Sequence, residues 1–152
     1  MRVCAALFFC LLPTLAFANP AATASKKTAA TIIQIDSATT RQVPSGKAKI
    51  QVLATGKNAF VGRLWMAAGG AVPLHRDPTE EYIYIVSGGG MMTIDGKTTQ
   101  VGPGTMVYMP ANAEVTYKNG DQPLVALQVF AGPESAAKYD RWQLVTPAKT
   151  TP

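Results

Sequence analysis

The residues best suited to chemistry gather in the stretch His-Arg-Asp-Pro-Thr-Glu-Glu, which begins at His75, the chain's only histidine. Side chains alternate along an extended segment, so His75 and Asp77 can point to one face, where a carboxylate from the next strand can meet them. An imidazole and carboxylates together suit a divalent transition metal such as manganese, iron, nickel or zinc. The alternative is a surface loop with ordinary charges, and composition alone favours that alternative.

Three further side chains are candidates for binding a substrate, namely Gln128, Tyr108 and Tyr117. Gln128 is the most informative, because residues 124–130 are otherwise wholly apolar. A buried amide needs hydrogen-bond partners, so Gln128 either bonds the neighbouring backbone or faces a ligand. The alternative for the two tyrosines is packing within the core.

The elements that must position these residues have the pattern of strands and turns, with short runs rich in β-branched and aromatic residues between Gly, Pro, Asn and Asp. Asp95-Gly96 is the strongest turn signal and predicts a hairpin. Pro133 precedes the single convincing helix, at residues 134–142. An all-β sandwich or barrel with a short C-terminal helix follows. We predict strands at 31–35, 50–54, 60–66, 70–74, 81–87, 90–94, 97–101, 106–109, 114–118 and 124–130.

The N-terminus has the features of a secretory signal peptide. Arg2 precedes an apolar run over residues 3–15 that is too short to span a bilayer, and the run ends in the small-residue pattern Ala16-Phe17-Ala18. We predict a signal peptide at 1–18 and export to the periplasm or the medium, with no membrane span in the mature protein. A retained membrane anchor is disfavoured, because neither stop-transfer length nor a basic flank accompanies the run.

The mature chain contains no cysteine, because Cys4 and Cys10 both lie in the predicted signal peptide. A disulfide framework and a thiol catalyst are therefore excluded. Residues 19–31 and 146–152 are polar and lack apolar periodicity, so we expect both ends to be mobile and one domain to span 32–145.

The formal net charge is +5, and it falls by one when Arg2 is removed with the signal peptide. The basic residues are scattered, and Lys26-Lys27 is the only adjacent basic pair. Nucleic-acid binding requires a basic stripe with interleaved aromatic residues or a recognisable binding fold. Neither is visible, so we predict no nucleic-acid partner.

Two motifs have a spacing that can be compared with known families. The first runs Gly69, five residues, His75, one residue, Asp77, three residues, Glu81, six residues, Gly88. The second runs Gly104, five residues, Pro110, one residue, Asn112, two residues, Val115, three residues, Asn119. Both motifs resemble those of the cupin superfamily, in particular its small single-domain, type 2-like members. The resemblance implies a double-stranded β-helix, or jelly-roll barrel, that holds a small molecule in its interior, and it implies a homodimer.

The motifs depart from the family pattern at the metal site. The family has histidine where this chain has Asp77, and it has its last histidine ligand where this chain has Val115, which cannot bind a metal. Glu114 beside it should face the other side of a regular strand. The resemblance selects Glu81 rather than Glu80 as the third ligand, so the implied metal set is His75, Asp77 and Glu81.

Three functions follow from this weakened site. The leading hypothesis is an exported protein that binds a small molecule in the barrel, assisted by one divalent transition metal. The first alternative is a metal-dependent oxygenase, isomerase or lyase that acts on a small substrate. The second alternative is a metal-free dimeric barrel with a structural or partner-binding role. The sequence identifies no catalytic residue, and fold alone does not choose among the three.

Overall fold

The structure, a computed structural model, describes residues 29–145, which form eleven strands and two short 3-10 helices. The predicted signal peptide 1–18, residues 19–28 of the segment that follows it, and the tail 146–152 lie outside the described residues. Within the described range, no helix is both long and apolar enough to cross a membrane.

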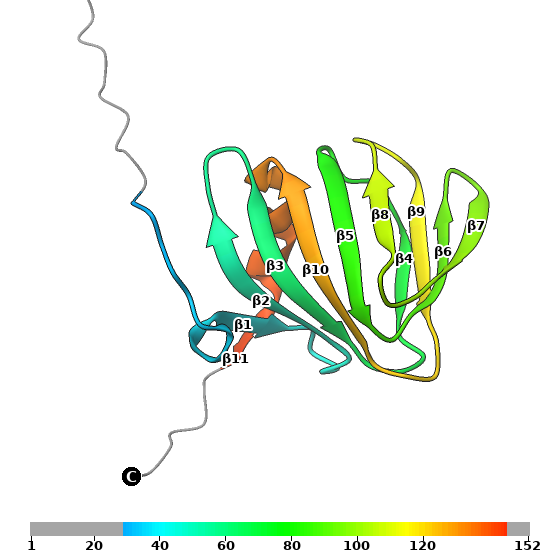
Figure 1. The fold of residues 1–152 in the computed structure, drawn as a ribbon, viewed down its shortest axis with the longest axis horizontal. Helices are drawn as coiled ribbons and strands as arrows, with labels where there is room; N and C mark the ends of the chain where they lie inside the picture. Colours follow the sequence, from blue (N-terminus) through cyan, green and yellow to red (C-terminus); the bar gives the residue numbers. More distant parts are fainter. Residues whose placement is uncertain (1–28, 146–152) are drawn as a thin grey trace, which may run out of the picture.

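Two antiparallel sheets face each other and enclose the interior of a barrel (Figure 1). The strand order is β11-β1-β2-β3-β10-β5-β8 in the larger sheet and β4-β9-β6-β7 in the smaller one. Pairs such as β3 with β10 and β4 with β9 join strands distant in sequence, as in a jelly roll. The prediction of an all-β, double-stranded β-helix barrel is confirmed.

The strand bounds match most of the predicted runs. In the larger sheet they are β1 (Thr39–Gln42), β2 (Ala48–Thr55), β3 (Phe60–Met66), β5 (Glu80–Ser87), β8 (Met106–Met109), β10 (Leu124–Ala131) and β11 (Gln143–Val145). In the smaller sheet they are β4 (Ala71–His75), β6 (Gly90–Ile94), β7 (Lys97–Val101) and β9 (Val115–Asn119).

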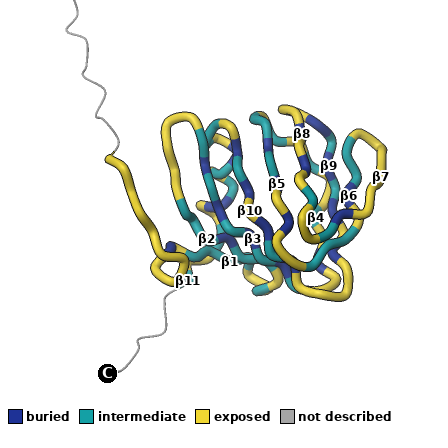
Figure 2. Tube along the Cα trace, viewed as in Figure 1, coloured by how far each residue is buried: buried dark blue, intermediate teal, exposed yellow. Residues whose placement is uncertain are grey.

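The core lies between the sheets, because burial alternates along their central strands (Figure 2). In β3 the inward row includes Leu64 and Met66, and in β10 it includes Ala126 and Phe130. Gln128 is a polar member of the same inward row of β10 and is 4% exposed. The alternation therefore carries an amide group into an otherwise apolar interior.

The predicted hairpin is present between β6 and β7. Ile94 pairs with Lys97, which leaves Asp95 and Gly96 as the two turn residues. Both have positive φ, 47° and 79°. This is the backbone that a two-residue turn between twisted strands requires, and Asp-Gly is well suited to it.

Two predictions near the ends of the barrel need correction or refinement. The predicted strand at 31–35 is wrong: residues 31–34 form no regular element, and Ile32 is 94% exposed. The 3-10 helix η1 (Ile35–Ser37) follows, and the first strand is β1, which pairs with β2 and β11. The predicted C-terminal helix is present as the 3-10 helix η2 (Pro133–Arg141).

Candidate ligand cavity and metal site

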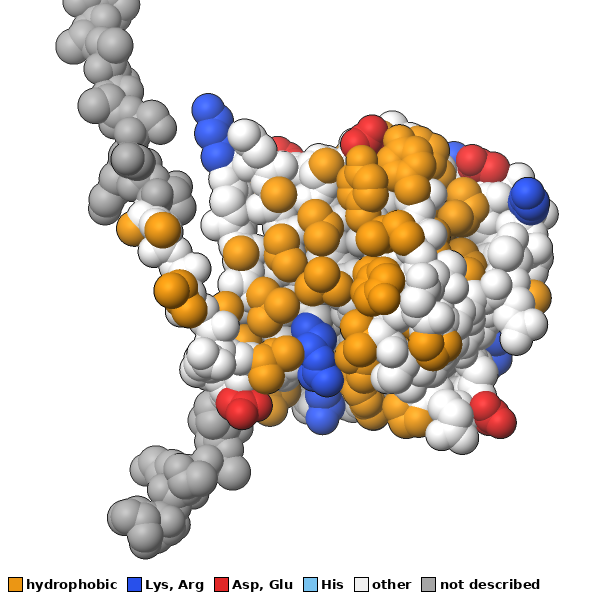
Figure 3. Space-filling view, in the orientation of Figure 1, with side chains coloured by type: hydrophobic (Ala, Val, Ile, Leu, Met, Phe, Trp, Pro, Cys, Tyr) orange, Lys and Arg blue, Asp and Glu red, His pale blue; other side chains and the backbone are white. Residues whose placement is uncertain are grey.

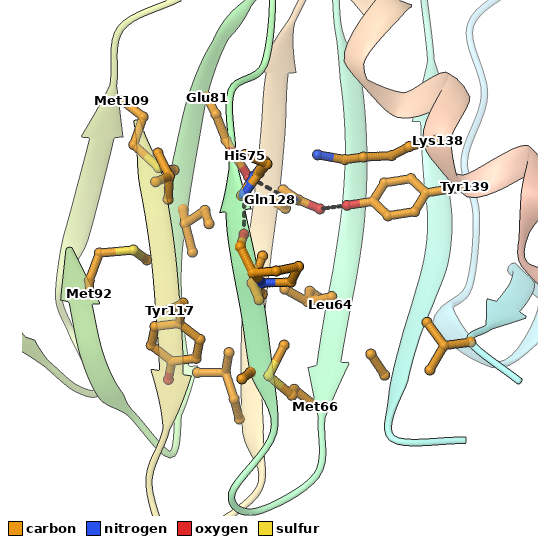
Figure 4. A pocket seen from close by; sticks show the side chains of 18 of the residues that line it. Leu64, Met66, His75, Glu81, Met92, Met109, Tyr117, Gln128, Lys138 and Tyr139 are labelled. Carbon is orange, nitrogen blue, oxygen red and sulfur yellow. Dashed lines mark hydrogen bonds between the residues drawn. The ribbon is translucent and has the colours of Figure 1, made fainter. Parts of the chain in front are cut away.

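A cavity of about 400 Å³ lies between the two sheets. Small-molecule sites in proteins generally have volumes of about 300–1,000 Å³. Most of the wall is apolar, and polar side chains gather at one end of it (Figure 4). The apolar wall includes Leu64, Met66, Ile85, Met92 and Met109, and the polar end includes His75, Glu81, Gln128 and Lys138.

His75 is the last residue of β4 and lies opposite Val115 of β9. Its Nδ1 lies 3.0 Å from the carbonyl oxygen of Pro73, to which the protonated nitrogen donates. Its Nε2 lies 3.6 Å from Oδ2 of Asp77. The interaction with Asp77 raises the pKa of His75, although burial opposes this effect. The ring is thus fixed by the backbone with Nε2 directed at the carboxylate, the arrangement that orients metal-binding histidines.

Asp77 follows β4 in the loop that leads to β5, and its side chain meets a lysine from η2. The Nζ atom of Lys138 donates to Oδ2 of Asp77 at 2.6 Å. Burial alone would raise the pKa of Asp77, but the bonds from His75 and Lys138 outweigh it and lower that pKa. Asp77 is therefore a carboxylate at neutral pH with a cation in direct contact.

Glu81 lies on the inward face of β5 and is 5% exposed. It accepts a hydrogen bond from the amide of Gln128, and the amide oxygen of Gln128 accepts one from the hydroxyl of Tyr139 at 2.6 Å. Burial raises the pKa of Glu81, and the bond from Gln128 opposes this only in part. Burial also raises the pKa of Tyr139. Gln128 thus links the buried carboxyl group to η2.

The donor set fits a divalent metal in type and spacing. One ligand atom each from His75, Asp77 and Glu81 lies within 4.8 Å of the other two. An imidazole nitrogen and two carboxylate oxygens are suitable ligands for manganese, iron, nickel or zinc. Val115 is buried on the cavity wall beside them and offers no donor. The residues present can supply three protein ligands and leave the remaining coordination positions to water or a ligand.

Arg76 and Glu114 face away from this cluster, as strand alternation predicts. Their side chains are exposed and form an ion pair with a distance of 2.7 Å between Nη2 of Arg76 and Oε2 of Glu114. Glu114 therefore does not replace the histidine ligand that is missing at Val115.

Two of the three predicted substrate-binding residues line the cavity, and the third does not. Gln128 and Tyr117 line the cavity, and the Tyr117 hydroxyl donates to Oδ1 of Asn119. Tyr108 does not line it, because the alternation of β8 turns its side chain to the outer face of the barrel, where it is 49% exposed. Its hydroxyl there donates to Glu80, which also accepts from Tyr82. Tyr108 therefore belongs to the outer surface.

Sequence reasoning missed the contribution of η2 and the residue after it. Lys138, Tyr139 and Trp142 all line the cavity. The spacing of Tyr139 and Trp142, three residues apart in a predicted helix, was the one signal that this segment packs against something, and their rings meet edge to face at 4.9 Å. No motif indicated that Lys138 reaches Asp77.

Fold and cavity together define a class of protein, a small jelly-roll barrel with an interior pocket. A family model described as a cupin domain matches residues 63–130. An uncharacterized protein of Streptomyces coelicolor is 33% identical over 79 residues, which are 52% of this chain and 75% of that protein. The chain belongs to the cupin superfamily.

Solved structures agree with this fold. An RmlC-like cupin from Shewanella frigidimarina is similar with a TM-score of 0.56 and 16% identity, over 60% of this chain and 82% of that one. The polyketide cyclase RemF from Streptomyces resistomycificus is similar with a TM-score of 0.60 and 15% identity, over 80% of this chain and 89% of that one. At these identities the likeness concerns the fold alone.

Proposed function

We propose that this protein binds a small, mainly apolar organic molecule in the barrel interior, with a polar group of the molecule against His75, Glu81, Gln128 and Lys138. The observation that carries the proposal is the cavity itself, which is apolar over most of its wall and polar at one end. Such a distribution suits a ligand whose apolar body supplies affinity and whose polar group fixes its orientation.

A fluorescent apolar anion such as 1-anilinonaphthalene-8-sulfonate tests the cavity directly. Val72 lines the cavity and is half-buried, whereas Val86 lies on the outer face and is 55% exposed. We expect Val72→Phe to weaken binding of the dye at least fivefold and the matched variant Val86→Phe to leave it unchanged. Equal binding by both variants and the wild type would contradict binding in the interior.

We further propose that a divalent transition metal, manganese, iron, nickel or zinc, is held by His75, Asp77 and Glu81. The spacing of their ligand atoms and the fixed ring of His75 support this. The metal would supply Lewis acidity toward an oxygen of the ligand. The protein residues hold the ion and keep the rest of the pocket apolar.

Elemental mass spectrometry on untagged protein from the exported fraction tests the metal site. We expect close to one equivalent of a transition metal in the wild type and its loss in His75→Ala. Glu80→Gln is the matched control, because Glu80 faces outward toward two tyrosine hydroxyls. Metal that persists in His75→Ala contradicts the site, and so does wild-type protein that takes up no metal when incubated with Mn²⁺ or Zn²⁺.

Glu81 supports an enzymatic alternative, a metal-dependent oxygenase, isomerase or lyase. Its carboxyl group is on the cavity wall, and its raised pKa brings it closer to the range in which a general acid or base works well. If a substrate is found, Glu81→Gln should remove turnover and retain binding. Retained turnover would exclude this role for Glu81.

Export and dimerisation complete the proposal. The sequence features of residues 1–18 support export, and Edman sequencing of protein from the periplasm or medium should begin at Asn19. The outer face of the larger sheet supports a homodimer, because it exposes apolar side chains on three neighbouring strands (Figure 3). A metal-free dimeric barrel with a structural role stays as the alternative if neither metal nor ligand is found.

A further inference from the structure

The ammonium group of Lys138 contacts Asp77, one of the three proposed metal ligands. Its Nζ atom is 2.6 Å from Oδ2 of Asp77, and Nε2 of His75 is 3.6 Å from the same oxygen. The one carboxylate oxygen that faces the histidine is therefore already in direct contact with an ammonium group. Figure 4 shows the Lys138 side chain directed at His75 and Glu81 from η2.

The backbone that carries Lys138 is held in place from both sides. The hydroxyl of Ser135, buried, lies 2.6 Å from that of Thr79 in the loop before β5. Tyr139, next to the lysine, donates to Gln128 and packs edge to face on Trp142. These contacts fix η2 against the barrel, so the lysine extends from a defined position.

The ammonium group also has a favourable environment apart from Asp77. Nζ lies 4.7 Å from the ring centroid of Phe130 and 5.8 Å from that of Tyr139. Aromatic faces stabilise a cation at such distances. Lys138 is thus placed by a carboxylate and two aromatic rings, and its side chain is only partly exposed. The ammonium group is therefore held in a defined position by its neighbours, unlike that of a solvent-exposed lysine.

We infer that Lys138 is a built-in competitor for the metal, so that a divalent ion binds His75, Asp77 and Glu81 only when the ammonium group leaves Asp77. The inference rests on the metal site of the proposed function. The lysine stem is flexible and has four carbons, so it can swing away while η2 stays docked. Lys138 then lowers the affinity of the site for a metal and stabilises the metal-free state.

The competition has a direct physical basis. Two cations that share one carboxylate oxygen repel each other, and the repulsion is strong in a partly buried site where water screens little. The ammonium also satisfies Asp77 in the absence of metal, so loading must replace an existing ion pair. Within residues 29–145, no buried side-chain nitrogen or oxygen lacks a hydrogen-bond partner.

The test is calorimetric titration of the chelator-treated protein with Mn²⁺ and with Zn²⁺. Lys138→Met keeps an unbranched side chain, one heavy atom shorter, and removes its charge. Arg141→Met removes the same charge from an exposed residue of η2, and Lys138→Arg keeps the charge at the site. We expect Lys138→Met to bind at least tenfold more tightly than the wild type, Arg141→Met to bind as the wild type does, and Lys138→Arg to bind no more tightly than the wild type.

Each other result has a distinct meaning. Equal affinity of Lys138→Met and the wild type, with binding lost in His75→Ala, overturns the competition and leaves the metal site standing. A gain in Lys138→Arg also overturns it, because charge is then not the cause. Absence of metal binding in the wild type and in every variant overturns the metal site and this inference together. The dye titration described above then tests the cavity separately.

A second measurement covers the case in which Lys138→Met does not fold. Crystals of the wild type soaked with Zn²⁺ then decide the question. Nζ displaced from Asp77 in the loaded protein supports the competition. Nζ still in contact with Asp77 beside a bound ion overturns it.

Discussion

A carboxyl group in an apolar interior favours its neutral form, and Glu81 is in that position on the cavity wall. Burial raises its pKa, and the amide bond from Gln128 only partly compensates. The neighbouring Asp77 has the opposite shift, because His75 and Lys138 stabilise its charge. Two carboxyl groups in one site therefore have pKa values that are pushed apart, an arrangement often found where one group must hold a proton.

This difference predicts a pH dependence of stability. The folded state retains the Glu81 proton to higher pH than the unfolded state does. The free energy of unfolding should therefore fall as pH rises from about 4 through the folded-state pKa and then level off. Each unit by which the pKa is raised corresponds to about 1.4 kcal/mol. In urea denaturation from pH 4 to 8, Glu81→Gln should gain stability relative to the wild type as pH rises, and parallel profiles would contradict the burial argument.

Tyr139 offers a second test at the level of one atom. Its hydroxyl donates to the amide oxygen of Gln128, which is buried. Tyr139→Phe should lower the free energy of unfolding by about 1–3 kcal/mol, because a buried acceptor is left without its donor. Tyr84→Phe is the control, since Tyr84 is 42% exposed on the outer face and should change stability by less than about 0.5 kcal/mol. Similar losses for both would contradict the assignment.

The residues of the candidate site were predictable to different degrees for a physical reason. His75, Asp77 and Glu81 lie close together in sequence, so strand alternation and motif spacing were sufficient to bring them together. Tyr108 follows the same alternation, but the sequence alone did not show which face of β8 is inward. Lys138 reaches Asp77 across 61 residues of chain, and that contact depends on how η2 docks.

At the level of elements, the hairpin of β6 and β7 contains two glycines that are needed for different reasons. Gly96 has a φ of +79°, and a Cβ there would meet nothing within 4 Å. Gly90 is close to the neighbouring strand, where a Cβ would lie 2.1 Å from the carbonyl oxygen of Lys118. The first glycine is needed for backbone conformation and the second for space.

The two positions therefore predict different losses of stability. Gly96→Ala should lower the free energy of unfolding by about 1 kcal/mol, from the strain of a left-handed backbone alone. Gly90→Ala should lower it by about 2 kcal/mol or more, because backbone atoms must move apart. Thermal and urea denaturation of both variants measure the difference. A larger loss of stability for Gly96→Ala than for Gly90→Ala would contradict the conclusion that Gly90 is required for steric reasons.

The prediction of elements failed where a strand depends on distant pairing. The central strands carry an alternating or wholly apolar pattern, and their bounds were predicted to within about two residues. Strand β1 has the sequence Thr-Thr-Arg-Gln and β11 has only three residues, so neither has a strong pattern. They are strands because β1 pairs with both β2 and β11, and β11 pairs with β1. The apolar residues at 31–35 lack such a partner and form no strand.

At the level of the whole molecule, the outer face of the larger sheet is unusually apolar. Tyr84 and Val86 of β5, Met106 and Tyr108 of β8, and Leu127 of β10 are all exposed, and these three strands are neighbours. Contiguous apolar surface of this kind commonly marks an interface. It supports the homodimer proposed above and indicates where the second copy would pack.

Charge introduced on this face should separate the protomers. The double variant Tyr84→Glu with Met106→Glu places two carboxylates on directly paired residues of β5 and β8. Sedimentation equilibrium should show a dimeric wild type and a monomeric double variant. Leu74→Glu, at a 63% exposed residue of the smaller sheet, should stay dimeric. A monomeric wild type would exclude the homodimer, and a dimeric double variant would place its interface elsewhere.

The pairing of β1 with β11 brings the first and last strands of the barrel together, with Thr40 opposite Val145 (Figure 1). A short linker could therefore join the two strands, and new termini could be opened at the exposed Asp95-Gly96 turn. Chain ends are well tolerated at exposed turns of this kind. The order of the strands along the chain is then separable from the architecture of the barrel, and a circularly permuted protein should retain the cavity, with η2 still connecting β10 to β11.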